Sequence, residues 1–510
     1  MTGGGRTGGA PAGRSEARRA VSNAGLNLLA GALPFPLALF TVPAVIAGFG
    51  VERYGLLATA GVVLAYFGLL DIGLGRASTR FLARSLAAGE RVGETFWTVT
   101  ALAAVVGLVG AGVMLGVASP LVRHLLRVPP ALADEAVTAF EVLAAAVPFA
   151  IVLPTLLGAL EAQRRFDVVA AIQVPSSALG LLAPLLVLPF TARIPMAIAA
   201  VAAVQAATCV AAAIACRRVL PAGSARIRPG AARELLGFGR WVAISNVVGP
   251  LMVNADRLAI GALLSIRAVT FYAAPYEMVS RLQLVPSSLL RALFPLFSAD
   301  RTPDVREARR LAVGAAGAIA LVMGPLAVFL VALSPELLRL WLGREFAVLS
   351  SPSLELLAVG VSVNALALVP YSLLQALGRP DVSAKFHLAE FVLYVPMLLI
   401  FLHWWGITGA AAAWAVRVTL DAVLLLLAAS RLVGAGEHAD RLARLSRFGV
   451  LLLGELVAAA LAAPLDAAVS AAAAVVLAAA AFGAGWRLAL DGVERAAAVD
   501  ALRRLGRARP

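Results

Sequence analysis

Three arginines in the second half of the chain lie within otherwise apolar stretches, each near an acid: Arg257 by Asp256, Arg281 by Glu277, and Arg417 by Asp421. In the second and third pairs the partners are four positions apart, which places them on one face of a helix. Charges at hydrocarbon depth are costly and mark substrate or ion pathways. Because an arginine fork stays charged even at such depth, the three arginines are predicted substrate-binding residues. The acids are predicted charge partners or ion-coupling groups, and pairing that only joins helices stays open as the alternative.

A second charged stretch ends a predicted helix in the first half: LLDIGLGRASTRFLA, residues 69–83. Arg80 and the following Arg84 fall near the cytoplasmic end, where their charged groups can extend to the lipid headgroups. Asp71 and Arg76 lie deeper, among glycines. We therefore include Arg76 among the predicted substrate-binding residues and Asp71 among the charge partners, with a position away from any cavity as the alternative.

The composition places these charges in a membrane protein. The chain has 510 residues, of which 61% are hydrophobic and 14% charged, and its mean hydropathy is +0.90. A typical soluble domain has about 25% charged residues. Apolar stretches of about 20 residues, each long enough to cross a bilayer core, recur from end to end. We predict an all-α polytopic membrane protein with about 14 transmembrane helices.

The sequence lacks the common motifs of catalysis and metal binding. A nucleotide-binding P-loop requires Gly-Lys-Ser/Thr, and the single lysine, Lys385, lies in SAKFH. The four histidines are scattered, with no HExxH or Cys/His cluster. The longest predicted external loops, 119–137 and 335–353, carry no recognisable catalytic constellation. We therefore predict no enzyme activity, no metal and no cofactor, and expect Cys209 and Cys216 to be small apolar core residues.

The net charge of +14 is spread over short loops between spans, which argues against nucleic acid as a partner. With both termini in the cytoplasm, the inside segments hold roughly four times as many basic residues as the outside loops. This asymmetry predicts cytoplasmic N- and C-termini. A basic C-terminal tail of this kind can lie on anionic membrane lipid, and a merely solvated tail stays open as the alternative.

A short pattern repeats after a proline at the ends of two predicted spans: LLGAL at 156–160 and LLQAL at 373–377. Six spans per repeat would give two parallel six-helix bundles around a central cavity, plus two extra helices, an architecture suited to alternating access. The predicted organisation is a disordered basic cytoplasmic tail (1–20), an N-terminal six-helix bundle (21–216), a cytoplasmic connector (217–234), a C-terminal six-helix bundle (235–430), an extra helix pair (431–487) and a basic cytoplasmic tail (488–510).

Several stretches resemble one family: YGLLATAGVVLAYFGLLDIGLGRASTRFLA (54–83), ELLGFGRWVAISNVVGPLMVNADRLAIGALL (234–264), FYAAPYEMVSRLQLVPSSLLRALFPLFSA (271–299) and LLQALGRPDVSAKF (373–386). Over roughly residues 20–430 the chain resembles Wzx-type polysaccharide flippases of the multidrug/oligosaccharidyl-lipid/polysaccharide exporter superfamily. The resemblance implies flipping of an undecaprenyl-pyrophosphate-linked oligosaccharide across the bacterial cytoplasmic (inner) membrane, by alternating access and without ATP hydrolysis, for surface polysaccharide biosynthesis. It makes a polysaccharide polymerase and chain-length machinery candidate partners.

Other functions stay open at this point. Within the same superfamily these are a cation-coupled multidrug antiporter and a lipid II flippase, and outside transport a polysaccharide polymerase or ligase. The antiporters typically use a carboxylate in the first bundle, and the first predicted span, 21–48, has none.

Overall fold

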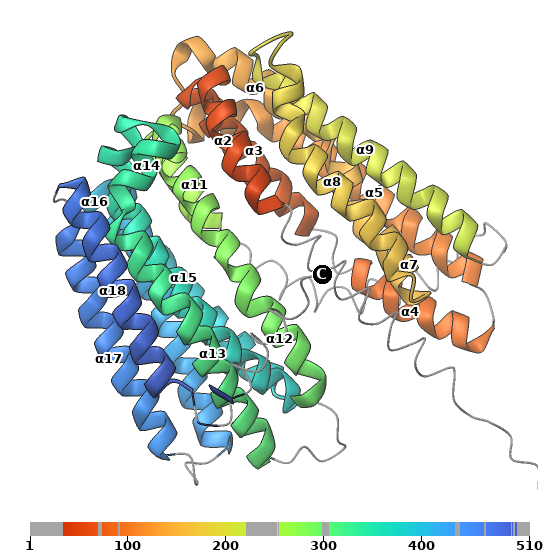
Figure 1. Cartoon of the computed structure of the whole chain (residues 1–510). Helices are drawn as coiled ribbons and strands as arrows, with labels where there is room; N and C mark the ends of the chain where they lie inside the picture. The colour runs from red at the N-terminus through yellow and green to blue at the C-terminus, as the bar shows by residue number, and fades with distance from the viewer. Residues whose placement is uncertain are drawn as a thin grey trace, which may run out of the picture. The chain divides into compact units, whose positions relative to one another are not determined.

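The computed structural model describes residues 34–69, 74–89, 92–220, 252, 254–297, 305–433, 439–463, 466–490, 492 and 495–496 (Figure 1). These residues form helices, and no strand occurs among them. The helices of the first half are α2 (Pro34–Phe49), α3 (Val51–Leu69), α4 (Leu74–Ala88), α5 (Val92–Pro120), α6 (Pro130–Ala144), α7 (Val147–Ala162), α8 (Phe166–Val187) and α9 (Ile194–Val219). Those of the second half are helix 254–263, α11 (Ile266–Ser280), α12 (Leu284–Phe297), α13 (Val305–Ala332), α14 (Ser334–Leu342), α15 (Arg344–Ala376), α16 (Pro380–Val433), α17 (Ala439–Ala462) and α18 (Ala467–Leu488).

Within the described residues, eight segments are long and apolar enough to cross a membrane: Val92–Leu125, Pro130–Ala162, Phe166–Val187, Ile194–Val219, Arg310–Ala332, Arg344–Ala376, Pro380–Leu432 and Ala467–Leu488. The apolar helix Pro36–Phe49 is shorter. The prediction of an all-α polytopic membrane protein is therefore confirmed.

The chain divides into two compact units. Unit 1 comprises Met1–Phe49, Val63–Leu121 and Pro130–Val247, and unit 2 comprises Gly50–Val62, Val122–Pro129 and Val248–Pro510. Two short pieces of the first half thus belong to the unit formed by the second half. The predicted boundaries of bundles, connector and tails stay a prediction, and 1–20 and 217–234 fall largely or wholly outside the described residues.

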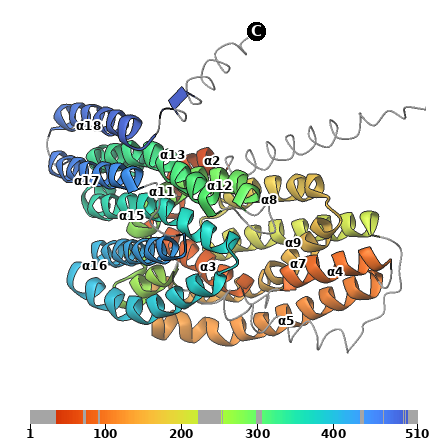
Figure 2. The ribbon, with the colours of Figure 1, turned by 90° about the horizontal axis from the view of Figure 1, so that it is seen from below.

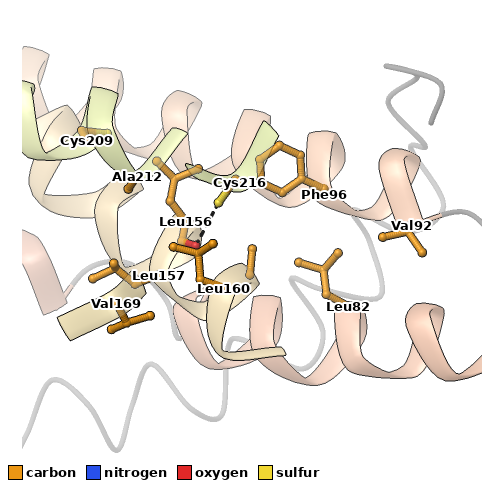
Figure 3. Close-up of a cluster of buried hydrophobic side chains, with 11 residues drawn as sticks. Leu82, Val92, Phe96, Leu156, Leu157, Leu160, Val169, Cys209, Ala212 and Cys216 are labelled. Atoms are coloured by element: carbon orange, nitrogen blue, oxygen red, sulfur yellow. Dashed lines mark hydrogen bonds between the residues drawn. The ribbon is translucent and has the colours of Figure 1, made fainter. Parts of the chain in front are cut away.

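Unit 1 is held together by apolar side chains of α4, α5, α7 and α9 (Figure 3). Leu156 and Leu160 of α7 pack among Leu82 of α4, Phe96 of α5 and Cys216 of α9. The Cys216 thiol donates a hydrogen bond of 3.3 Å to the Leu156 carbonyl (Figure 3). Both cysteines are free and buried, which confirms their prediction as small core residues.

Helices α4 and α7 approach closely at Gly158. A Cβ there would lie 2.5 Å from the Gly75 carbonyl oxygen and 2.8 Å from Thr79 Oγ1, so no larger residue fits without movement. The Ser78 hydroxyl donates to the Thr155 carbonyl at 2.9 Å. These contacts hold α4 against α7. Helix α4 contains most of the charged stretch 69–83.

In unit 2 the C-terminal helices α17 and α18 pack against each other and against α13 (Figure 2). Phe448 of α17 and Ala489, just after α18, form a buried cluster with Ala320 of α13. A Cβ at Gly317 would lie 2.3 Å from the Ala489 carbonyl oxygen. The backbone of Ala489 can approach α13 this closely because residue 317 is a glycine.

The first residues of α3 belong to unit 2 and bind other helices of that unit. The Thr270 hydroxyl of α11 donates to the Val51 carbonyl at 2.6 Å. Arg267 pairs with Glu52 at 3.1 Å and also with Glu345 at the start of α15. These exposed ion pairs contribute little stability individually, but together they connect three helices.

Helix α16 is 54 residues long and covers two predicted spans. Its backbone leaves the helical conformation at Gly406, where φ is 57° and ψ is −138°. Glycine adopts a left-handed φ readily because it lacks a Cβ. The kink lets residues before and after Gly406 face each other within one continuous segment.

The segments predicted as external loops, 119–137 and 335–353, contain helices. The first segment contains a π-helical turn, Leu121–Leu125, and the start of α6, and the second contains α14 and the start of α15. Charged residues in both segments lower the hydropathy without preventing a helix. Prolines near the starts of α6 and α14 favour helix initiation because the first turn needs no N–H from that position.

The two copies of the repeated pattern form similar turns. LLGAL ends α7 and LLQAL ends α15, and in each turn one residue has a positive φ. The next helix then opens with the same ion pair: Arg165 Nε to Asp167 Oδ1 at 3.0 Å, and Arg379 Nε to Asp381 Oδ1 at 3.0 Å. Matching geometry at both turns supports an internal repeat of this hairpin.

Candidate functional site

Helix 254–263 and α11 bring two of the predicted arginines together. Ser265 caps α11 by accepting a hydrogen bond from Ala268 N at 3.1 Å, which fixes the connection between these helices. Arg257 Nη2 lies 3.4 Å from Glu277 Oε1, and Arg281 Nη2 lies 3.0 Å from Glu277 Oε2. One carboxylate thus serves two guanidinium groups, which leaves one positive charge uncompensated in this trio.

Asp256 acts as a hydrogen-bond acceptor instead of pairing directly with the side chain of the neighbouring Arg257. It is 0% exposed, and its carboxylate accepts hydrogen bonds from the Arg257 backbone N–H, at 2.7 Å, and from the Tyr272 hydroxyl. The arginine side chain forms its ion pair with Glu277, twenty positions away. Spacing along the sequence had suggested Asp256 because it is adjacent, but adjacent residues of a helix point in different directions.

Aromatic rings complete this part of unit 2. The guanidinium of Arg257 lies 4.4 Å from the centre of the Tyr276 ring, a cation–π contact. Tyr276 in turn meets Trp414 edge-to-face, with ring centres 6.0 Å apart. Arg257 is only 8% exposed, so these rings hold its charge in a fixed position. We call Asp256, Arg257, Tyr272, Tyr276, Glu277 and Arg281 the Arg257 cluster.

A second group of charges lies on the two halves of α16. Arg417 Nη1 is 3.7 Å from Glu390 Oε2, and Asp421 Oδ1 is 3.6 Å from His387 Nε2. The guanidinium of Arg417 also lies 5.5 Å from the centre of the Tyr394 ring. We call His387, Glu390, Tyr394, Arg417 and Asp421 the Arg417 cluster. The sequence had paired Arg417 with Asp421 along one helix face, whereas the closest carboxylate in the structure comes from across the kink.

A ring contact joins the two clusters: Tyr276 of the Arg257 cluster packs edge-to-face on Trp414. Trp414, which touches Tyr276, is on the same helix segment as Arg417. The three arginines predicted from the second half therefore belong to one connected group of side chains in unit 2.

The structure describes neither of the side chains predicted for the site in the first half of the chain. Asp71 lies outside the described residues. Arg76 lies in α4 of unit 1, at a position whose side chain is not described. Their predicted roles in substrate binding and charge pairing stay predictions.

Five residues of the clusters were not predicted from the sequence: Tyr272, Tyr276, His387, Glu390 and Tyr394. Tyr272 and Tyr276 are four positions apart, and His387, Glu390 and Tyr394 follow a spacing of three and four. Both patterns place polar groups on one face of an apolar helix, so they could have indicated the site. Among the described residues, no group of three or more side chains is arranged to hold a metal ion.

Residues 49–351, more than half of the chain, match the family described as polysaccharide biosynthesis proteins. The chain belongs to this family. The whole Arg257 cluster falls within the matched range of the polysaccharide biosynthesis protein family, and the Arg417 cluster follows it. The resemblance inferred from sequence motifs is thereby confirmed.

The chain is also similar to a curated relative and, in its fold, to two solved structures. The chain is 27% identical over 418 residues to the "Putative O-antigen transporter" of Shigella flexneri, covering 82% of this chain and 99% of the relative. An inward-facing multidrug resistance transporter of the MATE family and MOP superfamily superposes with a TM-score of 0.66 at 15% identity, covering 79% of this chain and 94% of that one. The lipid II flippase MurJ, in an inward closed conformation, gives a TM-score of 0.66 at 11% identity, covering 89% and 97%. At these identities the two structures establish the fold alone.

Proposed function

We propose that this protein flips an undecaprenyl-pyrophosphate-linked oligosaccharide across the cytoplasmic membrane for surface polysaccharide biosynthesis. The observation that carries the proposal is the connected set of three arginines in unit 2, of which Arg257 and Arg281 share a single carboxylate. Membership of the polysaccharide biosynthesis family and the likeness to an O-antigen transporter support the same substrate class.

The chemistry of the site suits a diphosphate. The buried Nε–H groups of Arg257, Arg281 and Arg417 have no hydrogen-bond acceptor within the described part of the chain. A diphosphate supplies oxygens that accept from such forks with charge-assisted bonds. In this proposal Arg257, Arg281, Arg417 and Arg76 bind the substrate, while Asp71, Asp256, Glu277 and Asp421 balance charge or couple ions. The protein forms no bond in its substrate, and a polymerase with its chain-length machinery receives the flipped unit.

Cells lacking the protein are expected to accumulate completed lipid-linked oligosaccharide that faces the cytoplasm, because synthesis continues while flipping stops. The measurement is extraction of the lipid-linked units, with their sugar composition and linkage determined alongside their protection from external enzymes. Expression of the unaltered protein is the control and should remove the accumulation. A change in sugar composition or linkage would instead identify an enzyme of bond formation.

The proposed orientation has both termini in the cytoplasm of a bacterial inner membrane. A cysteine at Ser224 should then escape a membrane-impermeant thiol reagent in intact cells and react after permeabilisation. A cysteine at Ala131, an exposed position in the first turn of α6, should react in intact cells. The opposite labelling pattern would overturn the orientation.

A further inference from the structure

Trp414, in the second half of α16, has an indole N–H group that is buried without an acceptor. The residue is 4% exposed, and Nε1 has no hydrogen-bond acceptor within the described part of the chain. An indole N–H can only donate, and a buried tryptophan usually finds a partner for it. Because an unpaired buried donor lowers stability, we expect the acceptor to come from a molecule that binds there.

The packing of Trp414 sets the direction of this donor. A Cβ at Gly360 of α15 would lie 2.5 Å from Trp414 Cζ3 and 2.8 Å from Cε3, so the indole occupies the space that a side chain would need. These two atoms belong to the six-membered ring, whereas Nε1 lies on the opposite edge of the indole. Tyr276 of α11 packs on the ring edge-to-face, with ring centres 6.0 Å apart and planes at 79°. Contacts from two helices thus fix the ring with its N–H edge away from Gly360.

The neighbouring groups also include unpaired donors. Trp414 lies three positions before Arg417, on the same face of the helix. The guanidinium of Arg257 lies 4.4 Å from the centre of the Tyr276 ring that Trp414 contacts. The ion pairs of both arginines involve their Nη atoms, and their buried Nε–H groups have no acceptor among the described residues. Arginine and tryptophan offer donors only, so these three side chains suit a ligand rich in acceptor oxygens.

We propose that Trp414 is a further substrate-binding residue, whose indole N–H donates a hydrogen bond to a phosphate oxygen of the bound diphosphate. This role rests on the proposed function, in which Arg257, Arg281 and Arg417 bind the same group. The arginines supply positive charge, whereas the rigid indole supplies one neutral donor of fixed direction. Trp414 thus adds affinity for phosphate oxygens without adding a charge that the acids of unit 2 must balance.

Ultraviolet resonance Raman spectroscopy of the purified full chain tests this hydrogen bond, because an indole N–H vibration changes when the group gains an acceptor. Farnesyl diphosphate in detergent is the probe, and farnesol, which lacks the phosphates, is the control ligand. Farnesyl diphosphate should shift the band of one of the seven tryptophans of the unaltered protein, and farnesol should not. The shift should be absent in Trp414→Phe and present in Trp405→Phe, which removes a tryptophan that is 56% exposed.

Binding of the same probe measures what the donor contributes. Trp414→Phe should weaken binding of farnesyl diphosphate about 10-fold, a typical contribution of one hydrogen bond to a charged group. Trp405→Phe should bind the probe as the unaltered protein does.

A tryptophan analogue with sulfur in place of the N–H group, inserted at position 414, covers the case in which Trp414→Phe fails to fold. The analogue keeps the size of the ring and removes only the donor, so it should weaken binding of farnesyl diphosphate about 10-fold as well. Thermal stability without ligand should not fall, because the replaced N–H has no acceptor within the described residues.

The possible outcomes distinguish this role of Trp414 from the proposed function. If farnesyl diphosphate binds but shifts no tryptophan band, or if the analogue protein binds it with unchanged affinity, Trp414 is not a substrate-binding residue and the proposed function stands. A loss of thermal stability in the analogue protein without ligand would assign the N–H to a contact within the protein and would also overturn the proposal. If the unaltered protein does not bind farnesyl diphosphate, the role of Trp414 is refuted, and absence of flipping as well would refute the proposed function.

Discussion

Arg281→Gln is expected to reduce transport of lipid-linked oligosaccharide about 10- to 100-fold, since each charge-assisted bond to a diphosphate contributes about 1.5–3 kcal/mol. Its effect on stability should be small. Glu277 keeps Arg257 as a partner at 3.4 Å, and the lost pair was one-third exposed. The measurement is flipping in reconstituted vesicles together with thermal unfolding of the same preparation. A matched control is Arg165→Gln, which breaks an exposed arginine–aspartate pair of unit 1 and should leave transport unchanged.

A purely structural role for Arg281 predicts a different pattern. In that case the substitution lowers thermal stability, and adding Glu277→Gln restores both stability and transport. If Arg281 binds substrate, the double variant stays inactive whatever its stability. Full recovery of transport in the double variant would remove Arg281 from the proposed site.

Arg417→Gln is expected to lower the free energy of unfolding by about 3–5 kcal/mol, the usual cost of removing one partner from a buried ion pair. The substitution removes the cation that lies 3.7 Å from the Glu390 carboxylate, and Glu390 is 1% exposed. Adding Glu390→Gln should recover most of the lost stability because it removes the stranded carboxylate. Thermal unfolding of the three proteins in one detergent provides the comparison.

Arg417→Lys separates charge from geometry in the same experiment. Lysine restores the positive charge but not the planar fork, so stability should recover while diphosphate-dependent transport does not. An Arg417→Gln protein as stable as the original would show that the pair contributes no net stability.

The class of this protein follows from the sequence alone, because hydropathy summed over about 20 residues measures directly whether a segment prefers lipid. The pair of Glu277 and Arg281 was also predictable. Four positions along one helix fix the two side chains on the same face, and their ion pair forms even though a 3-10 turn begins at Arg281. The family resemblance likewise rested on short motifs, each of which lies within one stretch of the sequence.

The remaining partnerships depend on which helices pack together and in what register. Arg257 meets Glu277 from the next helix, and Arg417 meets Glu390 across the kink at Gly406. Hydropathy likewise did not reveal that 119–137 and 335–353 contain helices, since it reports the preference for lipid and not the conformation of the backbone. Spacing in the sequence determines which residues share a helix face. Which neighbouring helix such a face contacts depends on the packing of many apolar side chains throughout the unit. The sequence of a short segment does not determine that packing energy.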